Sequence, residues 1–307
     1  MKTLVFGSLN IDRTYTLDHF VQPGETITAD RLELFCGGKG FNQTIALARA
    51  GAEVSIAGAV GTDGDFLLAP LAAQGVDVSK IKRTDGESGH AVIQVNRSGG
   101  NSIIILAGAN GSITHTDVDH VLKDYAAGDR IVLQNEISSL DYLLKAAHAK
   151  GMTVVLNPSP FNAALDACDF ECVDYLLVNE VEAVTVAGME ETEDFDAVLN
   201  RIHALYPRMN VLMTLGHRGS VFFGADGLRC ECGVYRTAAV DTTAAGDCFT
   251  GFFLAALGKG KPVSAALKTA AIAAGISVSR KGAAPSIPTL VEVEAVDPAL
   301  VADRYER

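Results

Sequence analysis

The chain has 307 residues, of which 48% are hydrophobic and 20% are charged, and its formal net charge is −12. This balance is typical of a globular protein with a sizeable core. The acidic charge argues against nucleic acid or an anionic membrane as a partner, because both attract clustered lysine and arginine. A phosphate ligand is still compatible, since one pocket can be positive on an acidic protein.

The six cysteines match no zinc-binding spacing, which predicts reduced thiols in a cytosolic protein. An expected strand begins at Thr3 with no basic and apolar leader before it, so we expect no secretion signal. No apolar run reaches about 18 residues, so no membrane span is expected. These features predict a cytoplasmic location.

Short β-branched runs alternate with longer amphipathic stretches along the chain. Strands are expected at residues 4–8, 54–59, 130–134, 153–157, 175–178 and 211–214, followed by a meander at 221–224 and 228–232. Helices are expected at residues 42–50, 65–74, 140–150, 180–187, 194–206, 245–257 and 263–279. This alternation predicts an α/β fold with a doubly wound, mostly parallel central sheet flanked by helices.

Two regions break this rhythm. Residues 11–35 and 89–106 alternate apolar and polar positions and contain hairpin signals such as Arg97-Ser-Gly-Gly-Asn101. They predict a small antiparallel sheet outside the main one, which could act as a lid or be an insertion without function. With no repeat, low-complexity tract or linker in sight, residues 1–307 are expected to form one domain that carries this lid.

The first chemical motif is Gly37-Gly-Lys-Gly-Phe-Asn-Gln43. Glycines before a helix let the backbone approach a ligand closely, and the amides of the first turn are free to bind it. Lys39 could hold a hydroxyl or a phosphate, and Asn42 offers a donor and an acceptor to a diol. A structural glycine turn is the alternative, and the spacing is not that of a P-loop.

The second motif is Asp241-Thr-Thr-Ala-Ala-Gly-Asp247, which opens a helix. The small residues Ala244, Ala245 and Gly246 present bare amides that can stabilise a transferring phosphoryl group. Asp247 could accept the proton of an attacking hydroxyl. It could also be no more than a favourable charge at a helix start.

Polar residues also follow several other expected strands. Thr214-Leu-Gly-His-Arg-Gly219 forms a tight turn at the sheet edge where ligands of open α/β sheets bind, and His217 is expected to be exposed. Asn179 could cap a helix or, with Glu182, bind a magnesium phosphate through water. Asn10, Asp12 and Glu136 could converge on the same crevice, although a lone acid in a loop is usually only solvated.

Taken together, these motifs resemble those of the ribokinase family of carbohydrate kinases. The resemblance spans nearly the whole chain, from Gly7-Ser-Leu-Asn-Ile-Asp12 to Arg280-Lys-Gly-Ala-Ala-Pro-Ser286. It implies a ribokinase-like fold with a β lid, ATP with Mg2+ as the phosphate donor, Asp247 as the general base and an anion hole at Ala244, Ala245 and Gly246. A homodimer through the lid is also implied.

The resemblance assigns further residues to each ligand. The sugar would be bound by Asn10, Asp12, Gly38, Lys39, Gly40, Asn42, Glu136 and Asp247. The nucleotide would be bound by Asn179, Thr214, Leu215, Gly216, Arg218, Gly219, Gly246 and Asp247. An activating K+ would lie near Asp241, Thr243, Ser277, Arg280, Gly282 and Ser286, mostly on backbone carbonyls.

Three positions depart from the family pattern. Phe41 replaces a small residue, Leu106 stands where a polar residue is common, and Ala271 stands where a His or Asn packs beside adenine. The first two bear on the identity of the sugar, and the third on purine selectivity.

D-ribose, giving ribose 5-phosphate, is the expected substrate. Deoxyribose, a fructose-type sugar or a nucleoside are alternatives within the family. A non-catalytic sugar-binding regulator is the alternative outside it, although such a protein would need neither Asp247 nor the anion hole.

Overall fold

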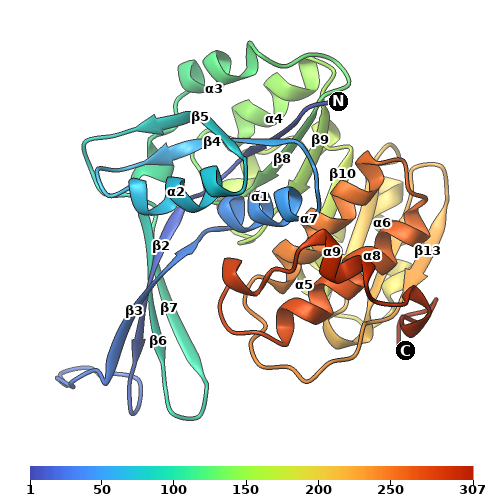
Figure 1. The fold of residues 1–307 in the computed structure, drawn as a ribbon. Coiled ribbons are helices and arrows are strands. Elements are labelled where there is room, and N and C mark those ends of the chain that lie inside the picture. Colours follow the sequence, from blue (N-terminus) through green and yellow to red (C-terminus); the bar gives the residue numbers. More distant parts are fainter. Residues whose placement is uncertain (307) are drawn as a thin grey trace.

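A computed structural model describes residues 1–306 and shows a large sheet between two layers of helices (Figure 1). Within these residues the large sheet has nine strands in the order β13-β12-β11-β10-β9-β8-β1-β4-β5. All neighbours from β11 to β5 are parallel, whereas β11-β12 and β12-β13 are antiparallel. Its strands are β1 (Thr3–Phe6), β4 (Val54–Val60), β5 (Asp77–Arg83), β8 (Arg130–Gln134), β9 (Thr153–Asn157), β10 (Tyr175–Asn179), β11 (Asn210–Thr214), β12 (Ser220–Phe223) and β13 (Arg229–Cys232).

Helices cover both faces of this sheet. The described α-helices are α1 (Lys39–Arg49), α2 (Asp65–Ala73), α3 (His115–Leu122), α4 (Leu140–Ala149), α5 (Glu180–Ala187), α6 (Phe195–Leu205), α7 (Ala245–Gly258), α8 (Val263–Val278) and α9 (Leu290–Glu294). Short 3-10 turns lie at Gly108–Ser112, Ala163–Ala167, Phe170–Cys172, Gly216–Arg218, Ala284–Ser286 and Pro298–Leu300.

The two faces of the sheet form separate hydrophobic cores. Val5 and Val132 pack with α1, α2, α7 and α8 on one face, and Leu4 and Ile131 pack with α3 to α6 on the other. Successive strand residues point to opposite faces, so strands buried on both sides must be apolar at every position. The predicted doubly wound α/β fold is therefore confirmed.

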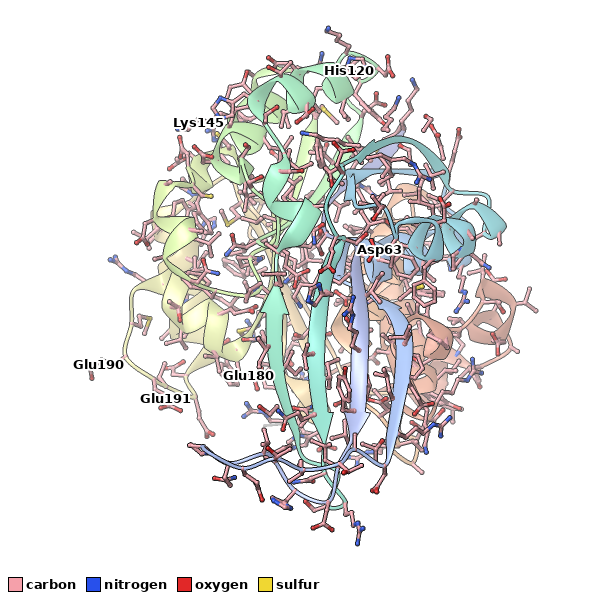
Figure 2. The ribbon with its side chains drawn as sticks, turned by 90° about the vertical axis from the view of Figure 1, so that its left-hand side faces the viewer. Asp63, His120, Lys145, Glu180, Glu190 and Glu191 are labelled. Atoms are coloured by element: carbon pink, nitrogen blue, oxygen red, sulfur yellow. The ribbon has the colours of Figure 1, made fainter. Side chains whose placement is uncertain are left out.

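A second sheet projects away from the body of the molecule (Figure 1), and its four strands face the viewer in Figure 2. Its order is β3-β2-β6-β7, formed by β2 (Asn10–Thr16), β3 (Arg31–Gly37), β6 (Gly89–Val95) and β7 (Asn101–Leu106). β2-β3 and β6-β7 are antiparallel, as expected, but β2-β6 is parallel. The reason is that β1 and β5 run parallel in the main sheet and lead in the same direction into β2 and β6.

Helices α1 and α7 lie side by side with their N-termini at the same end. A side chain at Gly251 of α7 would overlap Ala46 and the backbone of Leu47 in α1, so only glycine permits this approach. At the opposite end, Lys259 donates to the carbonyl oxygen of Ala50 at 2.8 Å. The two chemical motifs of the sequence open these two helices, so the packing brings the motifs together.

Most of the predicted elements are present within a few residues of their expected bounds. Helix α1 begins three residues earlier than expected, directly after Gly38, which has a φ of 87°. β5, α3 and α9 were not expected, because they are short and contain many charged or polar residues. Among residues 1–306, no helix has both the length and the apolar character needed to cross a membrane.

Candidate active site

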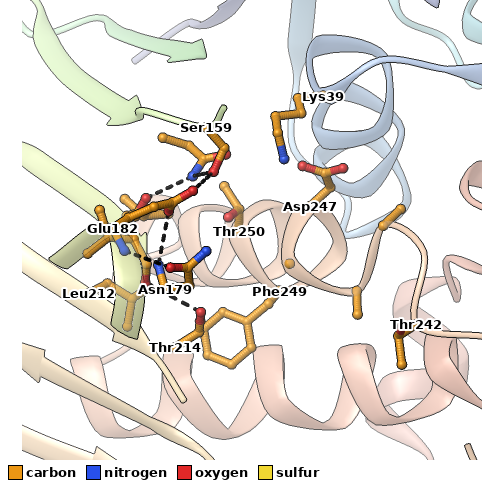
Figure 3. Close-up of a pocket in the computed structure, with 16 residues that line it drawn as sticks. Lys39, Ser159, Asn179, Glu182, Leu212, Thr214, Thr242, Asp247, Phe249 and Thr250 are labelled. Atoms are coloured by element: carbon orange, nitrogen blue, oxygen red, sulfur yellow. Dashed lines mark hydrogen bonds between the residues drawn. The ribbon is translucent and has the colours of Figure 1, made fainter. Parts of the chain in front are cut away.

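Two adjoining cavities lie at the carboxyl edge of the large sheet, beside the start of α7. The inner cavity has a volume of about 280 Å3 and is lined by polar groups that include Lys39, Ser159 and Asp247 (Figure 3). The outer cavity, of about 440 Å3, is largely apolar and is lined by α8 and by the segment after β13. Both cavities share Thr214, Thr242, Ala245, Gly246 and Phe249.

The N-terminus of α7 separates these two cavities. Ala244 adopts the left-handed conformation with a φ of 60°, and among the described residues no side chain caps the helix. A Cβ at Gly246 would meet no atom within 4 Å, so open space lies in front of its backbone. Uncapped amides at the positive end of a helix form a binding site for an anion.

The Asp247 carboxylate is held in place by two amides of α1. Asn42 Nδ2 donates to Oδ2 at 3.1 Å, and Gln43 Nε2 donates to Oδ1 at 2.9 Å. Gln43 Oε1 in turn accepts from Gln134 Nε2 at 2.7 Å. Asp247 is 7% exposed, so its carboxylate is nearly buried and fixed in orientation. Gln43 stands at the end of the first motif, but its contact with Asp247 was not expected from the sequence. Gln134 stands in no motif and was missed.

Lys39 faces Asp247 across the inner cavity (Figure 3). Burial alone would lower the pKa of its ammonium group. The carboxylates of Asp247, Glu136 and Glu182 outweigh burial and raise this pKa, so Lys39 stays charged. The inner cavity therefore holds one fixed positive charge opposite an anion-binding helix end.

A second group of polar residues lies between α1 and the small sheet. Glu136 Oε2 accepts from the Ser8 hydroxyl and from the Lys39 backbone N–H, the latter at 3.0 Å. Burial and, to a lesser degree, the charge of Glu136 raise the pKa of the Asp12 carboxyl to about 7. A side chain at Gly37 would overlap the Asp12 carboxylate, so the first motif makes room for this acid.

The strand register of the small sheet shows which of its residues accompany Asp12. Asp12 pairs with Phe35 and Ala91, and Ala91 pairs with Ile105, so these side chains share one face. Leu106 pairs with His90, one position along, and therefore lies on the opposite face. Ile105, and not its neighbour Leu106, therefore lies on the same face of the small sheet as Asp12.

Asn179 and Glu182 form a capping box at the start of α5. Asn179 Oδ1 accepts from the Glu182 N–H at 2.8 Å, and Glu182 Oε2 accepts from the Asn179 N–H at 3.1 Å. The Ser159 hydroxyl donates to Glu182 Oε1. The capping interpretation of Asn179 is thus confirmed, and both residues also line the inner cavity.

The Gly216–Arg218 turn contributes only part of its expected set to the cavities. Thr214, Gly216 and Gly219 line the outer cavity, as does the exposed His217. Leu215 is 1% exposed and belongs to the hydrophobic core. The Arg218 guanidinium lies 4.8 Å from the Phe195 ring centre, outside both cavities.

The two departures at Ala271 and Phe41 are explained by their surroundings. Ala271 lines the outer cavity with Ala274 and Gly275, and this small-residue wall leaves the cavity wide. Phe41 is fully buried in the core beneath α1, so its side chain does not enter the polar pocket.

The six residues expected near a monovalent cation lie in the loop before α7, in the last turn of α8 and in the segment that follows α8. Asp241 accepts from the N–H and hydroxyl of Thr243 and from the N–H of Gly282 at 2.9 Å. The hydroxyls of Ser277 and Ser286 lie 2.7 Å apart, both fully buried. Arg280 pairs with Glu292 at 2.7 Å, so its side chain points away from Asp241.

This donor set fits a weakly bound alkali cation better than a divalent one. It offers one carboxylate and otherwise neutral oxygens, which are hard ligands. In the described part of the chain, no three acidic, histidine or cysteine side chains are close enough to chelate a metal ion. A magnesium ion would therefore be held mainly by the phosphates that accompany it.

The fold and the site together define a kinase for a small hydroxyl compound. A fixed carboxylate lies beside a pocket of polar side chains and in the first turn of a helix without a side-chain cap, next to an apolar cavity. The chain belongs to the pfkB family of carbohydrate kinases, whose family model matches residues 2–290. The resemblance found in the sequence is thereby confirmed.

Relatives within this family are similar over nearly the full chain. The chain is 36% identical over 299 residues to a ribokinase of Haemophilus influenzae, covering 95% of this chain and 97% of the relative. A ribokinase from Cryptococcus neoformans var. grubii in complex with ADP has a TM-score of 0.83 at 36% identity, covering 96% and 99% of the two chains. An Arabidopsis thaliana ribokinase complexed with ribose and ATP has a TM-score of 0.85 at 30% identity, covering 96% and 97%.

The raised pKa of Asp12 predicts a pH-dependent KM for the hydroxyl substrate. Below pH 7 the free protein carries mostly protonated Asp12, which accepts hydroxyl protons poorly, and above pH 7 it carries the carboxylate. We expect the KM to rise about tenfold from pH 8 to pH 6 if only the carboxylate binds. In Asp12→Asn the KM should be higher and flat with pH. A wild-type KM that does not change over this interval would contradict the role of Asp12.

Proposed function

We propose that the protein transfers the terminal phosphoryl group of ATP to D-ribose and forms ribose 5-phosphate. The observation that carries this proposal is the Asp247 carboxylate, fixed by Asn42 and Gln43 between a polar pocket and the uncapped end of α7. The family and its ribose-named relatives support ribose as the sugar.

The sugar is proposed to lie between α1 and the small sheet, which acts as a lid. Side chains of opposite hydrogen-bonding character surround this space, as a polyol requires. Asn42 Oδ1 is buried without a partner among the described residues, which supports a ligand hydroxyl donating to it. The proposed contacts are Asn10, Asp12, Gly38, Lys39, Gly40, Asn42, Glu136 and Asp247.

The nucleotide is proposed to place its base in the outer cavity and its phosphates in the inner one. The apolar lining of the outer cavity suits a purine ring, and Lys39 suits a phosphate. Proposed contacts are Asn179, Thr214, Gly216, Gly219, Gly246 and Asp247, with Leu215 and Arg218 restricted to their backbone. Mg2+ bound to the phosphates would neutralise their charge, with water-mediated contacts to Asn179 and Glu182.

In this proposal Asp247 is the general base. Its carboxylate takes the proton from the attacking hydroxyl as the oxygen approaches phosphorus in line. The amides of Ala244, Ala245 and Gly246 form the anion hole for the phosphoryl oxygens. Asn42 and Gln43 keep the carboxylate oriented, so no reorganisation is needed during transfer.

The choice of sugar is tested by measuring ATP consumption with a panel of substrates. We expect the largest kcat/KM with D-ribose and smaller values with deoxyribose, fructose and nucleosides. Identification of the product by phosphorus NMR then shows which hydroxyl has reacted. Turnover of another substrate without turnover of ribose would contradict the ribose assignment. Sugar binding without any ATP consumption would indicate a regulator.

Replacing the proposed base tests its role. Asp247→Asn should lower kcat about 10²- to 10⁴-fold, because the amide cannot accept the proton. Sugar binding measured by calorimetry should persist, since the amide keeps the shape of the side chain. Asp65→Asn is the matched control, because Asp65 also lies in the first turn of a helix, α2, but lines neither cavity. Near wild-type turnover in Asp247→Asn would leave only a helix-dipole role for this carboxylate.

We also propose that K+ activates the enzyme at a site formed by Asp241, Thr243, Ser277, Arg280, Gly282 and Ser286. The ion would order the segment before the anion hole, since Asp241 and Thr243 lead directly into it. We expect kcat to be several-fold higher in KCl than in NaCl at equal ionic strength. Asp241→Asn should weaken the response to K+. Equal rates in the two salts would contradict the proposal.

A homodimer through the lid is proposed as well. Leu34, Ile104 and Leu106 lie on the lid face opposite Asp12 and are 51%, 64% and 53% exposed. Exposed apolar patches of this kind mark interaction surfaces. The mass of the protein in solution tests this, and a monomer at micromolar concentration would oppose it.

A cytoplasmic location is proposed on the basis of the six free cysteines, and fractionation of cells tests it.

A further inference from the structure

A buried pair of asparagine side chains joins the start of the lid to the main body. Asn110 follows β7 and is 1% exposed, and Asn10 begins β2 and is 5% exposed. Asn110 Nδ2 donates to Asn10 Oδ1 at 2.7 Å, although the two residues are 100 positions apart. No role was expected for Asn110 from the sequence.

The backbone of Leu9 determines which way the Asn110 amide points. The Leu9 N–H, which can only donate, reaches Asn110 Oδ1 at 3.1 Å. Asn110 Nδ2 must then lie on the other side, where it also approaches the Leu9 carbonyl oxygen at 3.4 Å. A backbone amide has no alternative orientation, so it fixes the side-chain amide unambiguously.

The orientation of the Asn110 carboxamide determines the orientation of the Asn10 carboxamide. Because Asn110 presents an N–H group, Asn10 must offer its oxygen to it. Asn10 Nδ2 is then turned away from Asn110, and none of the hydrogen bonds within residues 1–306 has this atom as its donor. Asn10 also lies two positions from Asp12 in β2, so both side chains are on the same face of the lid.

Gly89 leaves the room that this pair needs. A Cβ at Gly89 would overlap both Asn110 Nδ2 and Asn10 Oδ1. Gly89 pairs with Asn10 in the parallel β2-β6 register, which places it beside the hydrogen bond. Three separate segments of the chain are thus arranged around a single contact.

The carboxamide of Asn42 has the reverse polarity. Asn42 Nδ2 donates to Asp247, which accepts when it is ionised, so Asn42 leaves its oxygen free. Two asparagines of the same chemical type are therefore set in opposite directions by their neighbours. A sugar hydroxyl can donate and accept at once, so one hydroxyl could accept from the Asn10 N–H group while another donates to Asn42 Oδ1.

We propose that Asn110 is a positioning residue that holds the Asn10 carboxamide with its N–H group toward the sugar. A sugar hydroxyl is then bound at Asn10 as a hydrogen-bond acceptor. This inference rests on the proposed contact between Asn10 and the sugar. In this proposal Asn110 contacts no substrate, but it determines that Asn10 presents its N–H group, and not its oxygen, to the sugar.

Asn110→Asp tests the proposal with almost no change of shape. An ionised aspartate only accepts, so the Leu9 N–H keeps its partner while Asn10 must turn its N–H group toward residue 110. Asn10 then presents oxygen to the pocket, where a donor is needed. We expect the sugar KM to rise about 5- to 100-fold, with the KM for ATP and kcat changed less than about threefold.

A double-mutant cycle separates positioning from a general structural effect. Asn10→Ala alone should raise the sugar KM to a similar degree. In that background Asn110→Asp should add less than about a twofold effect, because no carboxamide remains to be turned. A full additional effect of Asn110→Asp in the Asn10→Ala background would overturn the proposal. An unchanged sugar KM in Asn10→Ala would instead contradict the sugar contact itself.

Two further variants make the test independent of folding. Gly89→Ala keeps both asparagine residues in the sequence, but its added methyl group would force their side chains apart. This variant should also raise the sugar KM. Asn210→Asp is the matched control, because Asn210 also accepts from a backbone N–H, that of Ala225, and donates to the Asp174 carbonyl oxygen, away from the cavities. Its sugar KM should be unchanged. Thermal unfolding confirms that each variant is folded, and a normal sugar KM in both folded Asn110→Asp and Gly89→Ala would overturn the proposal.

Discussion

The hydrogen bonds from Asn42 and Gln43 to Asp247 are the constraint on which the site depends. They connect the first turns of two helices that are more than 200 residues apart in the chain. A nearly buried carboxylate is costly unless donors surround it, and these amides supply the donors. The same two contacts hold the start of α1, with its polar side chains, next to the uncapped start of α7.

The fold could be predicted from the sequence wherever the pattern was strong. A strand with an apolar middle, such as Ile131-Val132-Leu133 within β8, favours a place inside a parallel sheet. β5 was not predicted because it is an edge strand that contains Lys80, Lys82 and Arg83. Charged edge strands prevent aggregation, but they also hide the periodicity on which prediction relies.

The site was predictable only as far as its motifs extend. Asp247, Lys39 and Asn42 stand in short runs whose residue types already indicate phosphate and hydroxyl chemistry. The contacts of Gln43, which ends the first motif, and of Gln134 and Asn110 could not be found in this way, because they are made with distant segments. An isolated glutamine or asparagine is ordinary in any sequence, and only the folded chain shows what it orients.

Gly251 limits which substitutions the chain can accept during evolution. Its backbone touches α1 directly, so no flexible side chain lies between the two helices to absorb a shift. Elsewhere in a core, a larger residue can be accommodated by new rotamers of its neighbours. Here a larger residue would move the helix that carries Asp247 relative to the one that carries Asn42. Sequence drift at this buried, chemically inert position would therefore alter the reaction itself and not only the stability of the fold.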